Sequence, residues 1–160
     1  MKPPIIIQFY PCFLGRVEFD AYVLKNDLRT HGIVRFKLDS GSDITTLSCK
    51  DLANLGYPDS YLLSRPKYAT TVTTADGKIV SLRYLDDVSI KFNDRELQGC
   101  RVYFALGTKM RSLFGNNILR YFKREIDYDI GELKLFERSA HSILSANETP
   151  IQIYSLEGVH

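Results

Sequence analysis

Apolar and polar residues alternate with a period of two over much of this 160-residue chain. Successive side chains of a β-strand point to opposite faces of a sheet, so this period predicts strands that bury one face. The pattern is clearest at residues 34–38, where three apolar residues alternate with Arg35 and Lys37. The segments IIIQFY and RVEFDAYVL, nearer the N-terminus, are rich in β-branched and aromatic residues. Many short strands separated by turn residues predict an all-β fold of the barrel or sandwich type.

Two short helices are expected among the strands. Residues 49–55 follow Ser48, a good N-cap residue, and precede Gly56, which favours the left-handed conformation that ends many helices. Residues 116–124, with the sequence NNILRYFKR, place apolar side chains on one side of a second helix. Residues 57–68 are expected to form a loop.

The composition argues against several classes of function. Hydrophobic residues make up 44% and charged residues 25% of the chain, and the net charge is +2. A charge this small predicts neither a nucleic-acid nor a membrane partner. No apolar run has the length of a membrane span or of the core of a signal peptide. The cysteines are far apart and the histidines scattered, which predicts no disulfide framework and no metal site. We therefore expect a cytoplasmic protein without a metal or an organic cofactor.

A carboxylate ends the alternating strand at residues 34–38. Asp39, Ser40 and Gly41 follow it directly, and aspartate is depleted in strands. The three residues are also common at an ordinary strand-to-turn junction, so the tripeptide alone is ambiguous. Its surroundings favour a functional site, because the polar turn leads back into an apolar segment. Further along the chain, two large apolar residues precede Gly115 and the second predicted helix.

Three segments, in this order along the chain, resemble the retropepsin-like aspartic proteases, the single-lobe relatives of pepsin. FKLDSGSDITTLS resembles the active-site segment of that family, and VTTADGKIV lies where its flap hairpin belongs. SLFGNNILRYFKREIDYDIGELKLF is similar to its apolar-apolar-glycine segment, short helix and last hairpin. The resemblance covers about residues 13–136. It implies an all-β, retropepsin-like acid-protease barrel over residues 1–137, with one or two short helices.

The resemblance implies a catalytic role for the tripeptide. Asp39 would be the catalytic carboxylate, the backbone N–H of Gly41 would support it, and the hydroxyl of Ser40 would brace two active-site loops against each other. The chemistry of this family uses two aspartates that share one proton, and the chain has one such motif. The near match at residues 129–131, Asp-Ile-Gly, lacks the hydroxyl and is typical of a turn. The resemblance therefore implies a homodimer whose two-fold axis brings together Asp39 from each chain.

Further residues are implied in substrate binding. Asp43 matches a position that often binds the substrate backbone, and Ala75, Asp76 and Gly77 form the expected tip of the flap hairpin. Asp76-Gly77 is also a common turn in an ordinary surface hairpin, so that alternative stays open. Thr73 and Thr74 are candidates for lining the cleft.

Two positions depart from the family pattern. Relatives often pair the aspartate at position 43 with an arginine, but Asn116 stands at the arginine position here. We expect Asp43 to hydrogen-bond to Asn116 or to the backbone instead. Ser42 stands where many retroviral members have alanine, and its hydroxyl is expected to favour the charged form of the nearby Asp39 carboxyl group.

Taken together, these implications predict an aspartic endopeptidase that cleaves peptides or unfolded protein segments through a water activated by the aspartate pair. The alternative is a catalytically inactive retropepsin-fold module for dimerisation or peptide binding. Residues 138–160 would be a C-terminal tail with a candidate dimer-interface strand at residues 150–154, PIQIY. IIIQFY, near the N-terminus, is either a second interface strand or an ordinary core strand.

Overall fold

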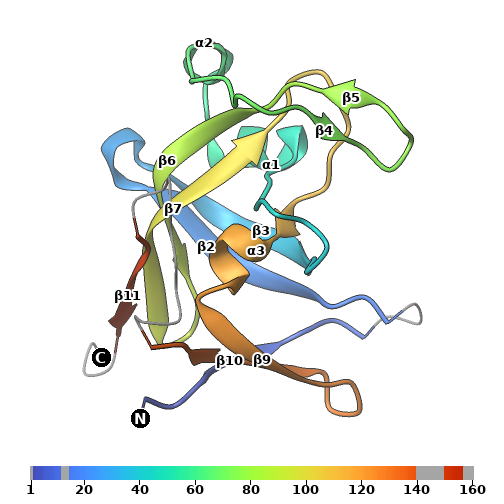
Figure 1. Ribbon diagram of the computed structural model, residues 1–160. Helices are drawn as coiled ribbons and strands as arrows, with labels where there is room; N and C mark the ends of the chain where they lie inside the picture. The colour runs from blue at the N-terminus through green and yellow to red at the C-terminus, as the bar shows by residue number, and fades with distance from the viewer. Residues whose placement is uncertain (1, 12–14, 140–149, 157–160) are drawn as a thin grey trace.

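The computed structural model describes residues 2–11, 15–139 and 150–156, and its longer strands form two β-sheets. One sheet has six strands in the order β11-β7-β6-β2-β3-β8 and curls into a half-barrel (Figure 1). Its strands are β2 (Glu18–Lys25), β3 (Thr30–Leu38), β6 (Arg83–Lys91), β7 (Arg95–Phe104), β8 (Leu113–Phe114) and β11 (Gln152–Ser155). The second sheet has the order β1-β10-β9 and consists of β1 (Ile5–Gln8), β9 (Phe122–Asp127) and β10 (Glu132–Glu137). A separate hairpin pairs β4 (Val72–Thr73) with β5 (Ile79–Val80).

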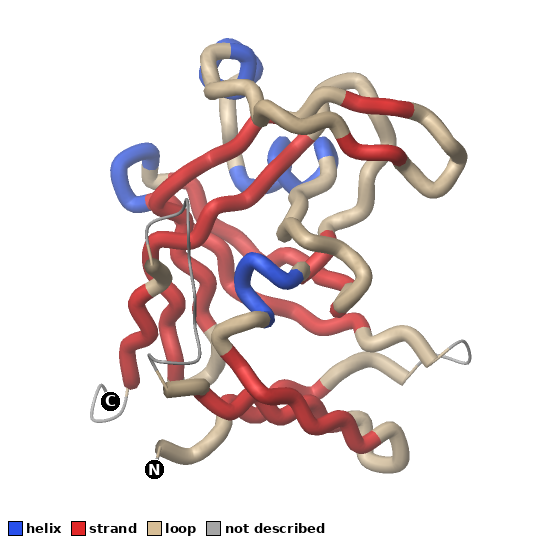
Figure 2. Tube along the Cα trace, in the orientation of Figure 1, coloured by secondary structure: helices blue, strands red, loops and turns tan. Residues whose placement is uncertain are grey.

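The helices are short and lie outside the sheets (Figure 2). They are a 3-10 turn (Asn26–Leu28), α1 (Cys49–Leu55), α2 (Asp59–Leu63) and α3 (Asn116–Leu119). The first predicted helix is confirmed in its bounds and in both of its end signals. The Ser48 hydroxyl accepts a hydrogen bond from the Asp51 N–H at 3.1 Å, and Gly56 has a left-handed φ of 95°.

Two local predictions are wrong. The expected loop at residues 57–68 contains the short helix α2, which begins after Pro58 and buries Leu62. The second predicted helix is cut short, because α3 ends at Leu119 and residues 122–124 belong to β9. There the backbone pairs with β10, so a long-range pairing prevails over the local helical pattern of NNILRYFKR.

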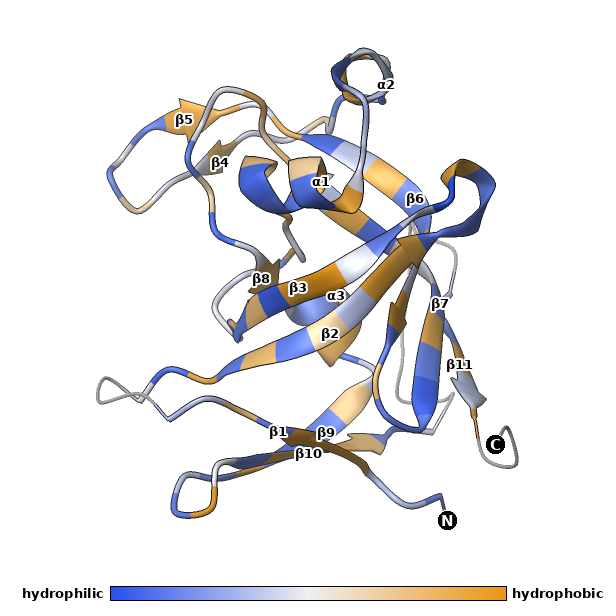
Figure 3. Ribbon diagram, turned by 180° about the vertical axis from the view of Figure 1, so that it is seen from behind, coloured by the Kyte–Doolittle hydropathy of each residue, from blue (hydrophilic) through white to orange (hydrophobic). Residues whose placement is uncertain are grey.

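The core lies on the inner face of the curled sheet, where the period-two residues of β2 and β3 meet the three-stranded sheet. Phe19, Val34 and Phe36 are fully buried, as the alternation predicted. Figure 3 shows hydrophilic and hydrophobic residues alternating along β2 and β3. These strands therefore present an apolar face inward and a polar face outward.

Both terminal strands pair within the chain. β1 pairs antiparallel with β10, with Ile5 opposite Leu135, and β11 pairs antiparallel with β7, with Ile153 opposite Leu97. Each predicted terminal strand is present, and within the described residues β1, β9 and β11 each keep one unpaired edge. A role of residues 150–154 in a dimer interface stays a prediction.

Candidate active site

Asp39 lies directly after β3, at the point where β3 runs parallel to β8. Leu38 is opposite Phe114 in this pair, and the Asp39 N–H donates to the Phe114 carbonyl oxygen at 3.0 Å. The half-buried Asp39 carboxylate accepts a hydrogen bond at Oδ1 from the Gly41 N–H, also at 3.0 Å. A Cβ atom on residue 41 would lie 3.3 Å from that oxygen. Glycine therefore lets the backbone approach closely enough to orient the carboxylate.

The loop after Asp39 is held by the beginning of α3. The first backbone N–H groups of a helix have no partner inside it. Here Asn116 and Asn117 donate these groups to the carbonyl oxygens of Ser42 and Asp43, at 2.8 and 3.1 Å. The Asn116 side chain donates from Nδ2 to the Ser40 carbonyl oxygen at 2.6 Å. Three backbone carbonyl groups of the loop, those of Ser40, Ser42 and Asp43, are thereby held by the start of α3.

Two of the expected side-chain contacts are wrong. Asn116 donates to the Ser40 carbonyl, whereas the Asp43 side chain is exposed and makes no hydrogen bond to another described residue. The Ser42 hydroxyl donates to the Ile44 carbonyl oxygen at 2.8 Å, so it serves the turn and not the Asp39 carboxylate. Both corrections arise because neighbouring backbone carbonyls lie closer to these side chains than the carboxylates do.

A buried polar cluster ties this loop to the chain around Gly115. The Thr45 hydroxyl, which is fully buried, accepts from the Gly115 N–H at 3.0 Å and donates to Asn117 Oδ1 at 2.7 Å. Asn117 in turn donates to the Arg101 carbonyl oxygen at 2.9 Å. A Cβ atom on residue 115 would lie 2.1 Å from the Ile44 carbonyl oxygen, which is an impossible contact. Glycine at this position is thus required for the loop to pack against β8.

Neither Thr45 nor Asn117 stands out in the sequence as a site residue. Each is a polar residue inside an otherwise apolar stretch, in ITTL and NNIL. Buried polar side chains in such stretches almost always have hydrogen-bond partners. This generalisation could have indicated that Thr45 and Asn117 are buried with hydrogen-bond partners, but not that they bond to each other.

A cleft of about 580 Å³ opens beside Asp39. The chain segment after β3 lies between the β4–β5 hairpin on one side and the three-stranded sheet on the other (Figure 1). The residues that line the cleft come from the Asp39 loop, the hairpin and the segment before β8: Lys37, Asp39, Gly41, Ser42, Asp43, Ile44, Thr46, Tyr68, Thr70, Thr71, Val72, Thr73, Thr74, Ala75, Lys109, Met110, Arg111 and Leu113. The hairpin therefore forms one wall of the cavity that contains the candidate catalytic carboxylate.

The comparisons with known proteins are consistent with this architecture. No protein-family model matches the chain, and no curated protein matches it significantly. Among solved structures, it is similar to a retropepsin-like aspartic protease from Rickettsia conorii, with 25% sequence identity and a TM-score of 0.58. The match covers 82% of this chain and 89% of that one. The fold is retropepsin-like.

The residues expected to form the flap lie in the β4–β5 hairpin and its turn. Of the residues expected at the flap, Thr73, Thr74 and Ala75 line the cleft, whereas Asp76 and Gly77 do not. Gly77 takes a left-handed φ of 84° in the turn. The Thr74 hydroxyl donates to the Asp76 carboxylate, and this hydrogen bond holds the pKa of Asp76 below its usual value. In this chain Asp76 therefore stabilises the turn itself.

The base of the hairpin rests on a small apolar cluster. Its buried members are Ile44, Leu82, Tyr103 and Ala105. Val72 and Val80, which face each other across β4 and β5, pack against this cluster. Ile44 belongs to the loop after Asp39, so one cluster connects the β4–β5 hairpin with the segment that positions Asp39.

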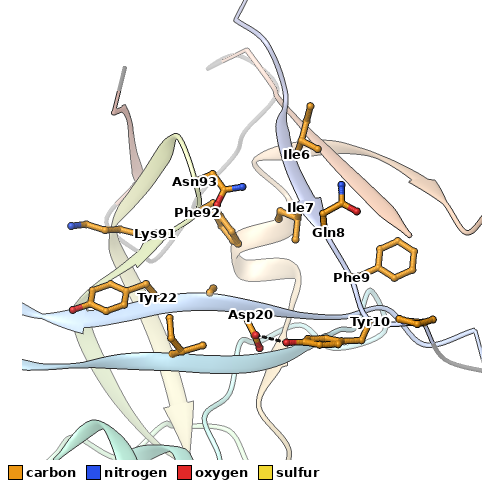
Figure 4. Close-up of a pocket in the computed structure, with 13 residues that line it drawn as sticks. Ile6, Ile7, Gln8, Phe9, Tyr10, Asp20, Tyr22, Lys91, Phe92 and Asn93 are labelled. Carbon is orange, nitrogen blue, oxygen red and sulfur yellow. Dashed lines mark hydrogen bonds between the residues drawn. The ribbon is translucent and has the colours of Figure 1, made fainter. Parts of the chain in front are cut away.

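A second groove of about 580 Å³ lies between β1 and the β2–β3 pair. Its one acidic lining residue is Asp20. Figure 4 shows the apolar side chains of Ile6, Ile7 and Phe92 in it, together with the hydrogen bond from the Tyr10 hydroxyl to Asp20. Asp20 is also 3.6 Å from the guanidinium group of Arg35. The carboxylate of this groove is already engaged, so the cleft at Asp39 is the candidate active site.

Within residues 2–11, 15–139 and 150–156, no group of three or more His, Cys, Asp or Glu side chains is arranged to hold a metal ion. Across the same residues, no helix has the length and apolar character needed to cross a membrane.

Proposed function

We propose that the protein is an aspartic endopeptidase, active as a homodimer in which each chain supplies Asp39. The observation that carries this proposal is the placement of the Asp39 carboxylate. It is oriented by the Gly41 N–H and lies in a cleft under a flap-like hairpin, within a retropepsin-like fold. Neighbouring groups that fix a carboxylate in one orientation prepare it for proton transfer.

Peptide hydrolysis at such a site requires two carboxyl groups with different protonation states. Two close carboxylates cannot both ionise easily, so one keeps its proton. The ionised Asp39 takes a proton from a water molecule as the water attacks the scissile carbonyl carbon. The protonated Asp39 of the partner donates to the carbonyl oxygen, and titration then belongs to the pair.

The chain's own carboxylates support a partner-supplied aspartate. Besides Asp39, the cleft is lined by one acidic residue, Asp43, whose carboxylate is exposed and lacks an orienting hydrogen bond from the described residues. The near match at residues 129–131 lies in the β9–β10 turn, where the Asp129 N–H donates to the Asp127 carboxylate. Ser40 is exposed, and its hydroxyl makes no hydrogen bond within the described part of the chain, which leaves it available to a second subunit.

Substrates would be extended peptides or unfolded protein segments that bind as a strand between the catalytic loop and the flap hairpin. Closure of the hairpin would exclude water from the reacting groups. The cleft mixes apolar and polar walls, with Ile44, Val72 and Met110 beside several threonines. Such a surface suits peptide side chains together with backbone hydrogen bonds.

The test is cleavage of a peptide library between acid and neutral pH by the purified protein and by its Asp39→Asn variant. We expect turnover by the wild type, inhibition by pepstatin, and a loss of about 10³-fold or more in kcat/KM on substitution. Asp129→Asn makes the same change at an exposed position in the β9–β10 turn, outside the cleft, so it serves as the matched control and should keep wild-type activity. A dimer that binds these peptides without cutting them would instead support the inactive binding module.

Mixing the two proteins tests the sharing of the site between chains. If equal amounts of wild-type and Asp39→Asn chains exchange freely, about one quarter of the dimers keep two aspartates. The activity per wild-type chain should then fall by about half. Activity that stays proportional to the wild-type chains would show that one chain works alone, and a stable monomer with full activity would show the same.

A further inference from the structure

Three basic residues line the cleft that contains Asp39: Lys37, Lys109 and Arg111. Lys37 has a special position among them, because it lies two residues before Asp39 along the same extended backbone. Residues two apart in a strand share a face and are about 7 Å apart. Lys37 therefore lies next to the catalytic carboxylate, at the distance of a neighbouring residue in a bound peptide.

The carboxylate nearest to Lys37 in the sheet is already engaged. Glu18 of β2 is directly opposite Lys37 in the strand pairing. One oxygen of Glu18 lies 2.7 Å from Nη2 of Arg111, and the other lies 3.9 Å from Nε of Arg16. Glu18 thus serves two arginines, and no ion pair joins Lys37 to an acidic residue anywhere in the described chain.

The surroundings of Lys37 strengthen the effect of its charge. On the side away from Glu18 its strand partner is Leu113, a half-buried residue that also lines the cleft. Lys37 is itself half-buried, whereas Lys109 is exposed and Arg111 is paired with Glu18. Charges interact more strongly beside an apolar wall than in open water. We therefore expect Lys37 to attract an anionic ligand more strongly than Lys109 or Arg111 does.

The charges of the cleft as a whole favour an anionic ligand. In the dimer, the two Asp39 groups that share one proton carry a single negative charge. The exposed Lys109 and Asp43, which also line the cleft, balance each other in each chain, and the Arg111–Glu18 pair is internally neutral. The two copies of Lys37, one on each side of the scissile bond, therefore leave the cleft with a net positive charge. The Lys37 side chain lines the cleft and has no ion-pair partner among the described residues, so a carboxylate that arrives with the substrate can pair with its ammonium group.

We propose that the cleft selects peptides with a glutamate or aspartate next to the scissile bond, and that Lys37 binds this carboxylate. The proposal rests on the proposed protease function, because it places the scissile bond over Asp39. Lys37 is a specificity-determining residue in this scheme and takes no part in proton transfer. The substrate class is therefore acidic peptides, in contrast to a purely apolar one.

The test compares matched peptides that differ in one residue beside the cut, with glutamate, glutamine or lysine at each flanking position. At pH about 6, where a glutamate side chain is ionised, we expect kcat/KM to be about 10-fold higher for glutamate than for glutamine. Added salt should reduce this ratio. Lys37→Met should abolish the preference, and Lys37→Glu should shift it toward the lysine peptide. Lys50→Met removes an exposed lysine of α1 outside the cleft and should leave the ratio unchanged.

The outcomes separate this proposal from the proposed function. Efficient cleavage of the glutamate and glutamine peptides at equal rates would overturn the acidic preference and leave the protease intact. A preference that persists in Lys37→Met, or a uniform change in the pH–rate profile for all peptides, would overturn the role of Lys37. If no peptide is cleaved, binding of the same peptides to the Asp39→Asn protein still measures the preference, and equal Kd values there would overturn it.

Discussion

The loop after Asp39 and the β4–β5 hairpin line the same cleft, but they are held in opposite ways. The loop at residues 39–46 is fixed by hydrogen bonds from β8, from the start of α3 and from the buried Thr45 hydroxyl. The hairpin is held by two residue pairs between β4 and β5, by the hydrogen bonds of its own turn and, at its base alone, by the packing of Val72 and Val80 on the small apolar cluster. A segment with few buried contacts opens locally at a low free-energy cost. The Asp39 carboxylate is therefore held in one orientation, whereas the β4–β5 hairpin beside it can open at a low free-energy cost.

The strongest test of this contrast replaces one glycine in each region by alanine. In Gly115→Ala the new methyl group would overlap the Ile44 carbonyl, so we expect a loss of about 3 kcal/mol or more in the free energy of unfolding. In Gly77→Ala no atom lies within 4 Å of the new Cβ, and the cost is that of a left-handed alanine, about 1 kcal/mol. Urea denaturation measures both values. Equal losses would mean that the loop is no more constrained than the hairpin.

A second pair of variants compares one threonine hydroxyl from each region. Thr45→Val keeps the shape but removes the hydrogen-bond partner of the Gly115 N–H and of Asn117 Oδ1, at a cost of about 2 kcal/mol. Thr74→Val removes an exposed hydrogen bond to Asp76 and should change the free energy of unfolding by less than about 0.5 kcal/mol. Thermal unfolding of the two variants under the same conditions gives the comparison. A Thr74 effect as large as that of Thr45 would contradict it.

The smallest expected effect concerns pH and the hairpin turn. Because the Thr74 hydroxyl lowers the pKa of Asp76 in the folded chain, the bond stabilises the turn fully above the unfolded pKa of about 3.9. That stabilisation is lost as the pH falls through the lower, folded pKa. An NMR titration of the Asp76 carboxyl carbon should show a midpoint below the usual one, which rises in Thr74→Val. An unchanged midpoint in that variant would mean that another group sets the pKa.

Much of the fold was predictable because its signals are local. The alternation at residues 34–38 predicted β3, and Ser48 with Gly56 predicted both ends of α1. The signals failed where distant segments decide. Phe122 belongs to an apolar pattern of helical period, but in the structure it pairs with Glu137 of β10. The short helix α2 buries a single residue, Leu62. The sequence around β9 does not reveal its pairing with β10, and the sequence around α2 does not reveal what covers Leu62.

In the candidate site too, the local contacts were predicted correctly and the contacts that depend on the path of the loop were not. The Gly41 N–H reaches Asp39 two residues away, so the motif itself predicted this contact. The partners of Ser42 and Asn116 depend on the path of the loop, and the predictions for both side chains were wrong. The alternation correctly predicts that Lys37 faces away from the core, but its position in the cleft depends on β8, which lies far along the chain.

The parallel pairing of β3 with β8 also has a consequence for when the protein can act. The Asp39-Ser40-Gly41 segment is synthesised early, but the Phe114 carbonyl and the α3 amides that hold its loop come much later in the chain. Closing so long a stretch costs conformational entropy and makes such contacts form slowly. A nascent chain that ends before β8 carries the complete motif without the means to hold its shape. The loop therefore cannot take up the conformation that orients Asp39 until most of the domain has been synthesised.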